Sequence, residues 1–301
     1  MDRGQQLADR VRAAAADGAP LVIRGGGSKA WYGDPVAGEV LDVSDHAGVI
    51  EYDPGELVLT CRAGTPLAEL RALLAENGQH LPFDPPAFGD RATVGGAVAC
   101  GFSGPARPWT GALRDYLLGT RIVNGRGEIL RFGGQVMKNV AGYDVSRLMA
   151  GARGTLGVLL DVSFKVLPRP ASECTLRFDG PQDEAIRRMN AWARQPLPLS
   201  GAAWEDGVLW LRLSGARSEV EFNARCIKCG QCVQVCPVEA IKLADLADGF
   251  GIGVPYIEAR AQACDFSCDG LQCVLACPTG ALTHDLNYPA ETRMGFARLA
   301  R

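Results

Sequence analysis

Long apolar runs are the clearest thing this sequence lacks. No stretch approaches the roughly 20 apolar residues that a membrane-spanning helix needs. The first 16 residues are polar and rich in Ala and Arg, without the apolar segment of a signal peptide. We therefore expect a cytoplasmic protein with no transmembrane segment, one that reaches the inner face of a membrane only through partners.

A strong net charge of either sign is also missing. The chain has 31 Lys and Arg against 34 Asp and Glu, a formal net charge of −3. This balance gives no broad attraction for nucleic acid, so we expect no nucleic-acid partner. An apolar content of 47% and a charged content of 22% are ordinary for a globular protein, and 301 residues suggest about two domains.

Cysteine, in contrast, is plentiful and unevenly placed. Eight of the 11 cysteines lie between residues 226 and 277, whereas the 37 glycines concentrate before residue 160. Clustered cysteines in a cytosolic chain indicate metal binding rather than disulfides. Because the cysteines and the glycines concentrate in different parts of the chain, they predict two modules. The other three, which we expect to be buried as small apolar side chains, are Cys61, Cys100 and Cys174.

The first cysteine run has the spacing of a bacterial ferredoxin. It follows C-x2-C-x2-C-x3-C-P and ends in Pro237. The second run is looser, C-x3-C-x4-C-x3-C-P, and ends in Pro278. Because the last cysteine of each run turns away at its proline, we assign it to the cluster of the other run. One [4Fe-4S] cluster then takes Cys226, Cys229, Cys232 and Cys277, and the other takes Cys264, Cys268, Cys273 and Cys236.

Two structural zinc sites are the alternative use of these eight cysteines. Zinc sites use Cys pairs separated by longer gaps, so this alternative is disfavoured. Four thiolates on each cluster leave no position open for a substrate, which predicts one-electron relay. The stretch Cys264–Leu282 resembles the ferredoxin-type proteins of periplasmic nitrate reductase systems (the G-subunit type), and the resemblance extends from about Asn223 to Arg301. It implies electron transfer between quinol-linked membrane partners and a reductase.

The glycine-rich half begins with an apolar strand that runs into three glycines, within Pro20–Lys29. Without Cβ atoms, such a loop brings backbone N–H groups close to a phosphate. A Rossmann turn is an alternative, because Gly25, Gly27 and Ala30 fit G-x-G-x-x-A. That turn must open a helix, whereas the following Trp31–Pro35 segment breaks one. A Rossmann fold is therefore disfavoured.

Further motifs follow in chain order, each with a local signal of its own. A Thr-Pro pair begins a helix, and an Asn-Gly pair marks a hairpin turn. The expected elements are a helix over Leu67–Glu76 with Thr65 as N-cap and Pro66 as N1, a glycine-bearing turn into a helix within Ala92–Ala99, a hairpin over 114–132 around Asn124-Gly125, and a turn over Gly151–Val158 before a strand at 159–167.

In this order the motifs resemble the FAD-binding domain of the p-cresol methylhydroxylase/vanillyl-alcohol oxidase (PCMH/VAO) type, over about residues 1–220. Within that superfamily, Met137–Gly151 is similar to the E subunit of glycolate oxidase. The resemblance implies an FAD site with these residues: Arg24, Gly25, Gly26, Gly27, Ser28 and Lys29 around the pyrophosphate; Pro85 and Pro86 along the adenosine or isoalloxazine path; Thr93, Val94, Gly95 and Gly96 as a second phosphate contact; Gly104 and Arg107 at the flavin edge; and Gly154, Thr155 and Val158 over the dinucleotide.

Histidine is scarce in this chain, with three residues in all. Covalent members of the resembling superfamily place a histidine inside the first glycine loop, where Ser28 here follows Gly27 directly. We therefore expect FAD to be non-covalent. His46 is expected at the surface, and no residue stands out as a catalytic base, so the catalytic residues are left unknown.

Together the two resemblances predict an FAD and iron–sulfur oxidoreductase that acts on a 2-hydroxy acid such as glycolate. The resembling E subunit works beside another flavin subunit and an iron–sulfur subunit, so such subunits are the expected partners. Two alternatives stay open. One is a ferredoxin-type electron relay without a substrate of its own, and the other is a non-physiological fusion of two proteins.

The expected fold class is α+β, in three segments. They are a PCMH-type FAD-binding domain (1–170), a partial substrate or cap domain (171–222) and a dicluster ferredoxin-like domain (223–301). No linker rich in Pro, Gly or Ser separates the last two, so the modules meet abruptly around Glu221–Ala224. A truncated cap is expected to expose a strand edge at Val208–Leu213.

Overall fold

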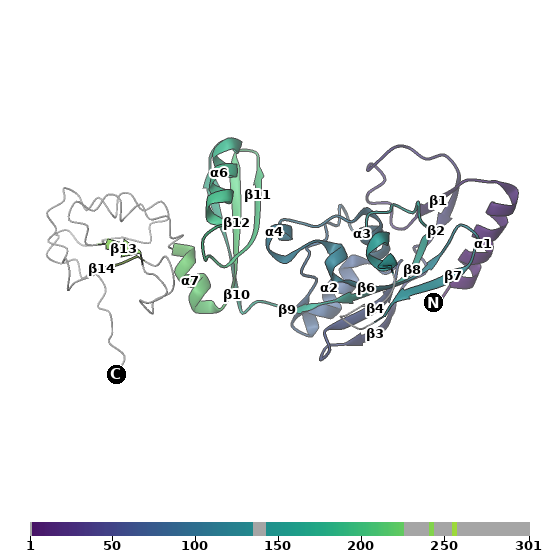
Figure 1. The fold of residues 1–301 in the computed structure, drawn as a ribbon, viewed down its shortest axis with the longest axis horizontal. Coiled ribbons are helices and arrows are strands. Elements are labelled where there is room, and N and C mark those ends of the chain that lie inside the picture. Colours follow the sequence, from purple (N-terminus) through teal and green to yellow (C-terminus); the bar gives the residue numbers. More distant parts are fainter. Residues whose placement is uncertain (1, 135–142, 226–240, 244–254, 258–301) are drawn as a thin grey trace. The chain divides into compact units, whose positions relative to one another are not determined.

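The computed structural model describes residues 2–134, 143–225, 241–243 and 255–257 (Figure 1). The chain divides into two compact units, Met1–Arg169 (unit 1) and Pro170–Arg301 (unit 2). Helices occur with mostly antiparallel sheets in the described residues, which confirms the expected α+β class.

Unit 1 is built on a five-stranded antiparallel sheet in the order β3-β4-β8-β6-β7 (Figure 1). Its strands are β3 (Val49–Asp53), β4 (Val58–Arg62), β6 (Leu117–Val123), β7 (Ile129–Gly133) and β8 (Val158–Lys165). Two small sheets pair β1 (Leu21–Arg24) with β2 (Glu39–Asp42) in parallel, and β5 (Gln79–His80) with β9 (Leu167–Pro168) in antiparallel. The helices are α1 (Gly4–Asp17), α2 (Leu67–Glu76), α3 (Val94–Cys100), α4 (Arg107–Thr110), the 3-10 helix η1 (Leu113–Tyr116) and α5 (Val145–Met149).

Strand β8 supplies residues to both apolar clusters of unit 1. One cluster joins Leu7 and Val11, which lie four residues apart on one face of α1, to Leu160. The larger cluster joins the buried leucines of α2 and the small residues of α3 to Val162. Burying one such side chain stabilises the fold by roughly 1.5–3 kcal/mol. The interior of unit 1 is therefore organised around β8.

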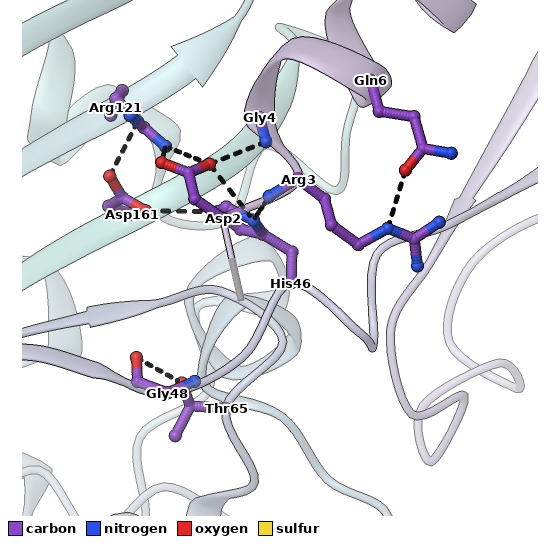
Figure 2. A network of polar contacts seen from close by, with 9 residues as sticks. All are labelled: Asp2, Arg3, Gly4, Gln6, His46, Gly48, Thr65, Arg121 and Asp161. Carbon is purple, nitrogen blue, oxygen red and sulfur yellow. Dashed lines mark hydrogen bonds and ion pairs between the residues drawn. The ribbon is translucent and has the colours of Figure 1, made fainter.

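Helix α2 spans Leu67–Glu76, as predicted, but its N-cap lies one residue later than expected. Pro66 is the N-cap and has extended backbone angles. The Thr65 hydroxyl instead accepts the N–H of Gly48 at 3.0 Å (Figure 2). It also donates to the carbonyl of Arg62 at 2.6 Å. The prediction of Thr65 as N-cap is wrong, because this side chain holds a turn between distant segments.

The hairpin around Asn124-Gly125 is confirmed, with a shorter first strand than expected. Strand β6 begins at Leu117 because η1 occupies the four residues before it. The Asn124 side-chain oxygen accepts the backbone N–H of Arg126 at 2.9 Å and of Glu128 at 3.0 Å. These bonds stabilise the turn locally, which is why a short sequence signal was sufficient to find it.

His46 is fully buried, so the prediction of a surface histidine is wrong. Its Nδ1 accepts the backbone N–H of Arg3 at 2.9 Å, and its Nε2 lies 3.2 Å from Oδ1 of Asp161. Asp161 in turn lies 2.7 Å from Nε of Arg121, which also contacts the carboxylate of Asp2 at 3.1 Å (Figure 2). The network ties the residues before α1 to β6 and β8, which gives this histidine a structural role.

Unit 2 has a three-stranded antiparallel sheet in the order β10-β12-β11. Its elements are β10 (Ser172–Asp179), α6 (Gln182–Trp192), β11 (Leu199–Glu205), β12 (Val208–Gly215) and α7 (Arg217–Arg225), followed by an antiparallel pair of β13 (Ile241–Leu243) and β14 (Pro255–Ile257). No helix in the parts of the chain that the structure describes has the length and apolarity to cross a bilayer.

The expected exposed edge at Val208–Leu213 is not found. These residues belong to β12, which is hydrogen-bonded on one side to β10 and on the other to β11. Leu209, Leu211 and Leu213 are buried. The abrupt join expected at Glu221–Ala224 lies inside α7, which packs on β10 and β12 with Val220 buried. The expected limits of the three segments stay predictions.

Candidate functional site

The first glycine-rich loop follows β1 and packs closely on the segment that leads into α3. A Cβ atom on Gly25 would lie 2.6 Å from Oγ1 of Thr93, and one on Gly26 would lie 1.4 Å from the carbonyl oxygen of Arg91. Contacts this short exclude any side chain at both positions. The two glycine motifs, far apart in the sequence, therefore lie against each other and depend on having no Cβ.

A second close approach sets the position of α3. A Cβ atom on Gly95 would lie 2.6 Å from the Cβ of Ala63, just after β4. The Gly95 N–H donates to the Ala63 carbonyl at 2.7 Å, and the Thr93 hydroxyl accepts the N–H of Gly96 at 3.2 Å as N-cap. The small residues of the predicted turn thus bring the start of α3 against the sheet.

These segments line a cavity of about 460 Å³, together with the loop before β8. Ten of the predicted cofactor residues line it: Arg24, Gly25, Gly26, Gly27, Ser28, Lys29, Thr93, Gly95, Gly96 and Gly154. One sequence motif thus supplies the loop after β1, and two others supply further residues of the cavity wall.

Seven predicted cofactor residues do not line this cavity. Val94 and Val158 belong to the apolar clusters. Thr155 is exposed, and its hydroxyl donates to the Ala152 carbonyl at 2.6 Å. The others are Pro85 and Pro86 in the loop after β5, Gly104, whose Cβ would lie 2.6 Å from the Asp84 carbonyl oxygen, and exposed Arg107 in α4.

Several residues of the cavity wall were missed by sequence reasoning. Arg153 and Gly157 lie in the Gly151–Val158 motif, so the motif itself was a signal for them. Tyr32 and Asp34 follow the first glycine loop directly. Their motif position alone did not show which side chains turn toward the cavity, because that depends on how the two loops cross.

Lys29 is the most buried charged side chain of the cavity wall, with 8% exposure. Its Nζ lies 3.4 Å from the Ser28 hydroxyl, and among the described residues no carboxylate lies within ion-pair distance of it. Burial lowers the pKa of Lys29, since desolvation disfavours the charged amine.

The charged residues of the wall are Arg24, Lys29 and Arg153 against the single carboxylate of Asp34. A buried cation without a counter-charge is costly, and an anionic ligand offsets that cost. The excess of positive charge therefore suits a group with about two negative charges, such as the diphosphate of a dinucleotide.

Cys100 also lines the cavity and is half-buried, so it is not the fully buried side chain that was expected. Burial raises the pKa of its thiol, while nearby Lys29 and Arg153 act in the opposite direction. Cys61, in contrast, is buried as predicted, and desolvation raises its pKa to about 12. Cys174 is half-buried in β10.

The eight predicted cluster ligands, Cys226 to Cys277, lie outside the described residues. In the residues that are described, no group of three or more His, Cys, Asp or Glu side chains is placed to hold a metal ion. The donor set itself is eight cysteines in two runs, and thiolates are the ligands that [4Fe-4S] clusters take.

Comparison with known families assigns two separate parts of the chain. Residues 2–133 match the family described as the FAD binding domain, and residues 225–281 match the 4Fe-4S dicluster domain. The chain therefore carries an FAD binding domain followed by a 4Fe-4S dicluster domain, as the two resemblances indicated. FAD and two [4Fe-4S] clusters are the cofactors of these domains.

Individual relatives cover only parts of the chain. Over 220 residues it is 53% identical to the glycolate oxidase subunit GlcE of Escherichia coli (strain K12), which is 73% of this chain and 63% of that protein. Over 89 residues it is 44% identical to the ferredoxin-type protein NapG of the same organism, 30% of this chain and 38% of NapG. The chain thus spans less than two thirds of the length of both relatives.

A solved structure shares the fold of the larger part. The alkyldihydroxyacetonephosphate synthase structure superposes with a TM-score of 0.60 at 19% identity, covering 74% of this chain and 48% of that one. At this identity the likeness concerns the fold alone.

Proposed function

We propose that this protein is an FAD and iron–sulfur oxidoreductase of a 2-hydroxy acid such as glycolate, in which electrons pass from flavin to two [4Fe-4S] clusters. The observation that carries the proposal is the cavity between the two glycine loops. Its walls lack Cβ atoms at Gly25 and Gly26 and hold Lys29 without a carboxylate partner. Such a cavity suits the diphosphate of FAD.

Individual residues have distinct tasks in this site. The loop Gly25–Lys29 presents backbone N–H groups to the phosphates, and Thr93 keeps the start of α3 in place through Gly96. Lys29 holds a positive charge at the diphosphate. Of the seven predicted residues that lie off the cavity wall, Val94 and Val158 are buried in the apolar clusters and meet no ligand, and the other five would meet only parts of FAD that extend beyond the cavity. When bound, FAD accepts an electron pair from the substrate, and the clusters accept electrons singly.

FAD is proposed to be held without a covalent bond, because Ser28 occupies the position after Gly27. Acid precipitation of the purified flavoprotein tests this point. A non-covalent flavin stays in the supernatant, whereas a yellow pellet would overturn the proposal.

The substrate class and the partners rest on the similarity to the glycolate oxidase subunit. We propose other flavin and iron–sulfur subunits as partners, and a cytoplasmic location with any membrane contact made through them. The test uses the full chain reconstituted anaerobically with FAD, iron and sulfide, and then mixed with glycolate or D-lactate. Bleaching of the visible flavin band supports oxidation by this chain, and an unchanged band with both acids contradicts it.

An electron relay without its own substrate is the second candidate, favoured by the 44% identity of the C-terminal part to a ferredoxin-type protein. Reduced clusters with an unchanged flavin band, after addition of a reduced quinol-linked partner, would support it.

A non-physiological fusion is tested by amplifying source DNA across codons 215–230. One uninterrupted reading frame supports a natural fusion, and two separate frames exclude it.

A further inference from the structure

We propose that Arg153, held over the ring of Tyr32, is a specificity-determining residue that makes the cavity select ligands with two linked phosphates over monophosphates. The inference rests on the proposed FAD site and names the part of the ligand that the site recognises.

The backbone of Arg153 is fixed in an unusual conformation. Its φ of +49° lies in the left-handed region, which a residue with a side chain adopts rarely. Its N–H donates to the carbonyl of Ala99 at 2.9 Å, and Gly154 follows with a φ of +81°. This turn before β8 is therefore tied to α3, and it directs Arg153 to the cavity wall.

The side chain of Arg153 is held by an aromatic ring rather than by an acid. Its Cζ lies 5.2 Å from the ring centroid of Tyr32, a cation–π distance. It crosses Gly33 so closely that a Cβ there would lie 1.9 Å from Nη1. Among the described residues, no carboxylate lies within ion-pair distance of Arg153. The guanidinium is thus positioned in advance while its charge stays available to a ligand.

Arg153 and Lys29 reach the cavity from different loops. Lys29 belongs to the loop after β1 and Arg153 to the loop before β8. Both side chains line the same cavity as Cys100, and both cations act to lower the pKa of its thiol. A single phosphate satisfies one of them, whereas two linked phosphates satisfy both.

The two cations also differ in how they bind phosphate. An arginine offers a planar pair of N–H donors to phosphate oxygens, while a lysine acts as a point charge. Because Tyr32 already orients the guanidinium, little side-chain freedom is lost when a ligand binds. We therefore expect Arg153 to add affinity for the second phosphate of a nucleoside diphosphate.

The experiment measures dissociation constants of ADP, AMP and FAD for the full chain stripped of flavin, by calorimetry and flavin fluorescence. Wild type should bind ADP about tenfold more tightly than AMP. Arg153→Gln should lose this ratio and weaken FAD about tenfold, with AMP changed less than twofold. Tyr32→Phe should keep the preference and Tyr32→Leu should reduce it. Arg126→Gln, in the exposed hairpin turn, removes the same charge and should change nothing.

Each contrary outcome has a definite meaning. Equal weakening of ADP and AMP by Arg153→Gln, or no weakening of either, overturns the specificity role while the FAD site stands. Wild type that binds neither FAD nor ADP overturns the proposed function itself. If circular dichroism shows that Arg153→Gln does not fold, Arg153→Lys replaces it. That variant keeps the charge without the planar donors, so loss of the ADP preference supports the proposal and full retention contradicts it.

Discussion

Nε2 of His46 lies 3.2 Å from Oδ1 of Asp161, in the interior of unit 1. Because Nδ1 of the same ring accepts the N–H of Arg3, the proton of the neutral imidazole is on Nε2 and is donated to Asp161. The histidine therefore bridges the chain before α1 and strand β8 (Figure 2).

Removal of this bridge should loosen the N-terminal helix. His46→Ala leaves the N–H of Arg3 without its acceptor and Asp161 with one partner fewer, and should lower the free energy of unfolding by about 2 to 3 kcal/mol. Urea unfolding, followed by circular dichroism, measures the change. The control is Asp45→Ala, which removes the exposed ion pair to Arg3 and should cost at most about 1 kcal/mol. Equal losses in both variants would contradict a structural role for the buried pair.

The contact between the two glycine loops predicts a sharp effect of one methyl group. Gly26→Ala would place Cβ 1.4 Å from the carbonyl oxygen of Arg91, so the loops must separate and FAD affinity should fall more than about tenfold. Gly125→Ala is the matched control, since a methyl group there would have no neighbouring atom within 4 Å. FAD titration of both variants should show loss only in the first, and retained affinity in Gly26→Ala would refute the close approach.

Lys29 predicts a pH dependence of cofactor binding. Burial lowers the pKa of Lys29 in the free protein, and a bound diphosphate should raise it again. FAD affinity should therefore be constant at pH values where the free amine is protonated. It should fall as pH rises through the pKa of the free amine, and because this pKa is lowered, the fall should begin before pH 10.5 is reached. Lys29→Arg should abolish the fall because arginine stays charged, and Lys29→Met should bind weakly at every pH. A fall of the same size in Lys29→Met would assign the titration to another group.

The last cysteine of each run is assigned to the cluster of the other run, so a change at one end of the cysteine module should affect a cluster whose other ligands are distant in the sequence. Cys277→Ser should disrupt the cluster of Cys226, Cys229 and Cys232, with loss of about half the iron and one of two EPR signals. Cys174→Ser, in β10, should keep all the iron. A variant of Cys277 that loses only the signal removed by Cys264→Ser would show that each cysteine run binds its own cluster.

Local features of this protein could be found from the sequence. The helix at Leu67–Glu76 and the hairpin at Asn124-Gly125 depend on contacts between neighbours in the chain, and both are found where they were predicted. The glycine loop after β1 could also be found, since the absence of Cβ atoms is a property of the residues themselves and does not depend on the fold. Family comparison bears out the FAD and cluster domains.

Long-range contacts were beyond the sequence. The residues next to His46 in the sequence do not predict its contact with Asp161, because the pairing of β4, β6 and β8 brings the two together. The strand at Val208–Leu213 was expected at an exposed edge because the cap was taken to be truncated, but it is the central strand between β10 and β11, an order that the sequence pattern does not give.

The amino-acid sequence is enough to show which residues lack side chains at the cofactor loops and which carry thiols, because these are properties of single positions and short spacings. The contacts of Gly26 with Arg91 and of Arg153 with Tyr32, in contrast, are seen first in the folded chain. Such pairs form between segments that no local preference links. Their geometry follows from how the sheet and helices bury their apolar faces, so it emerges when the whole unit has packed.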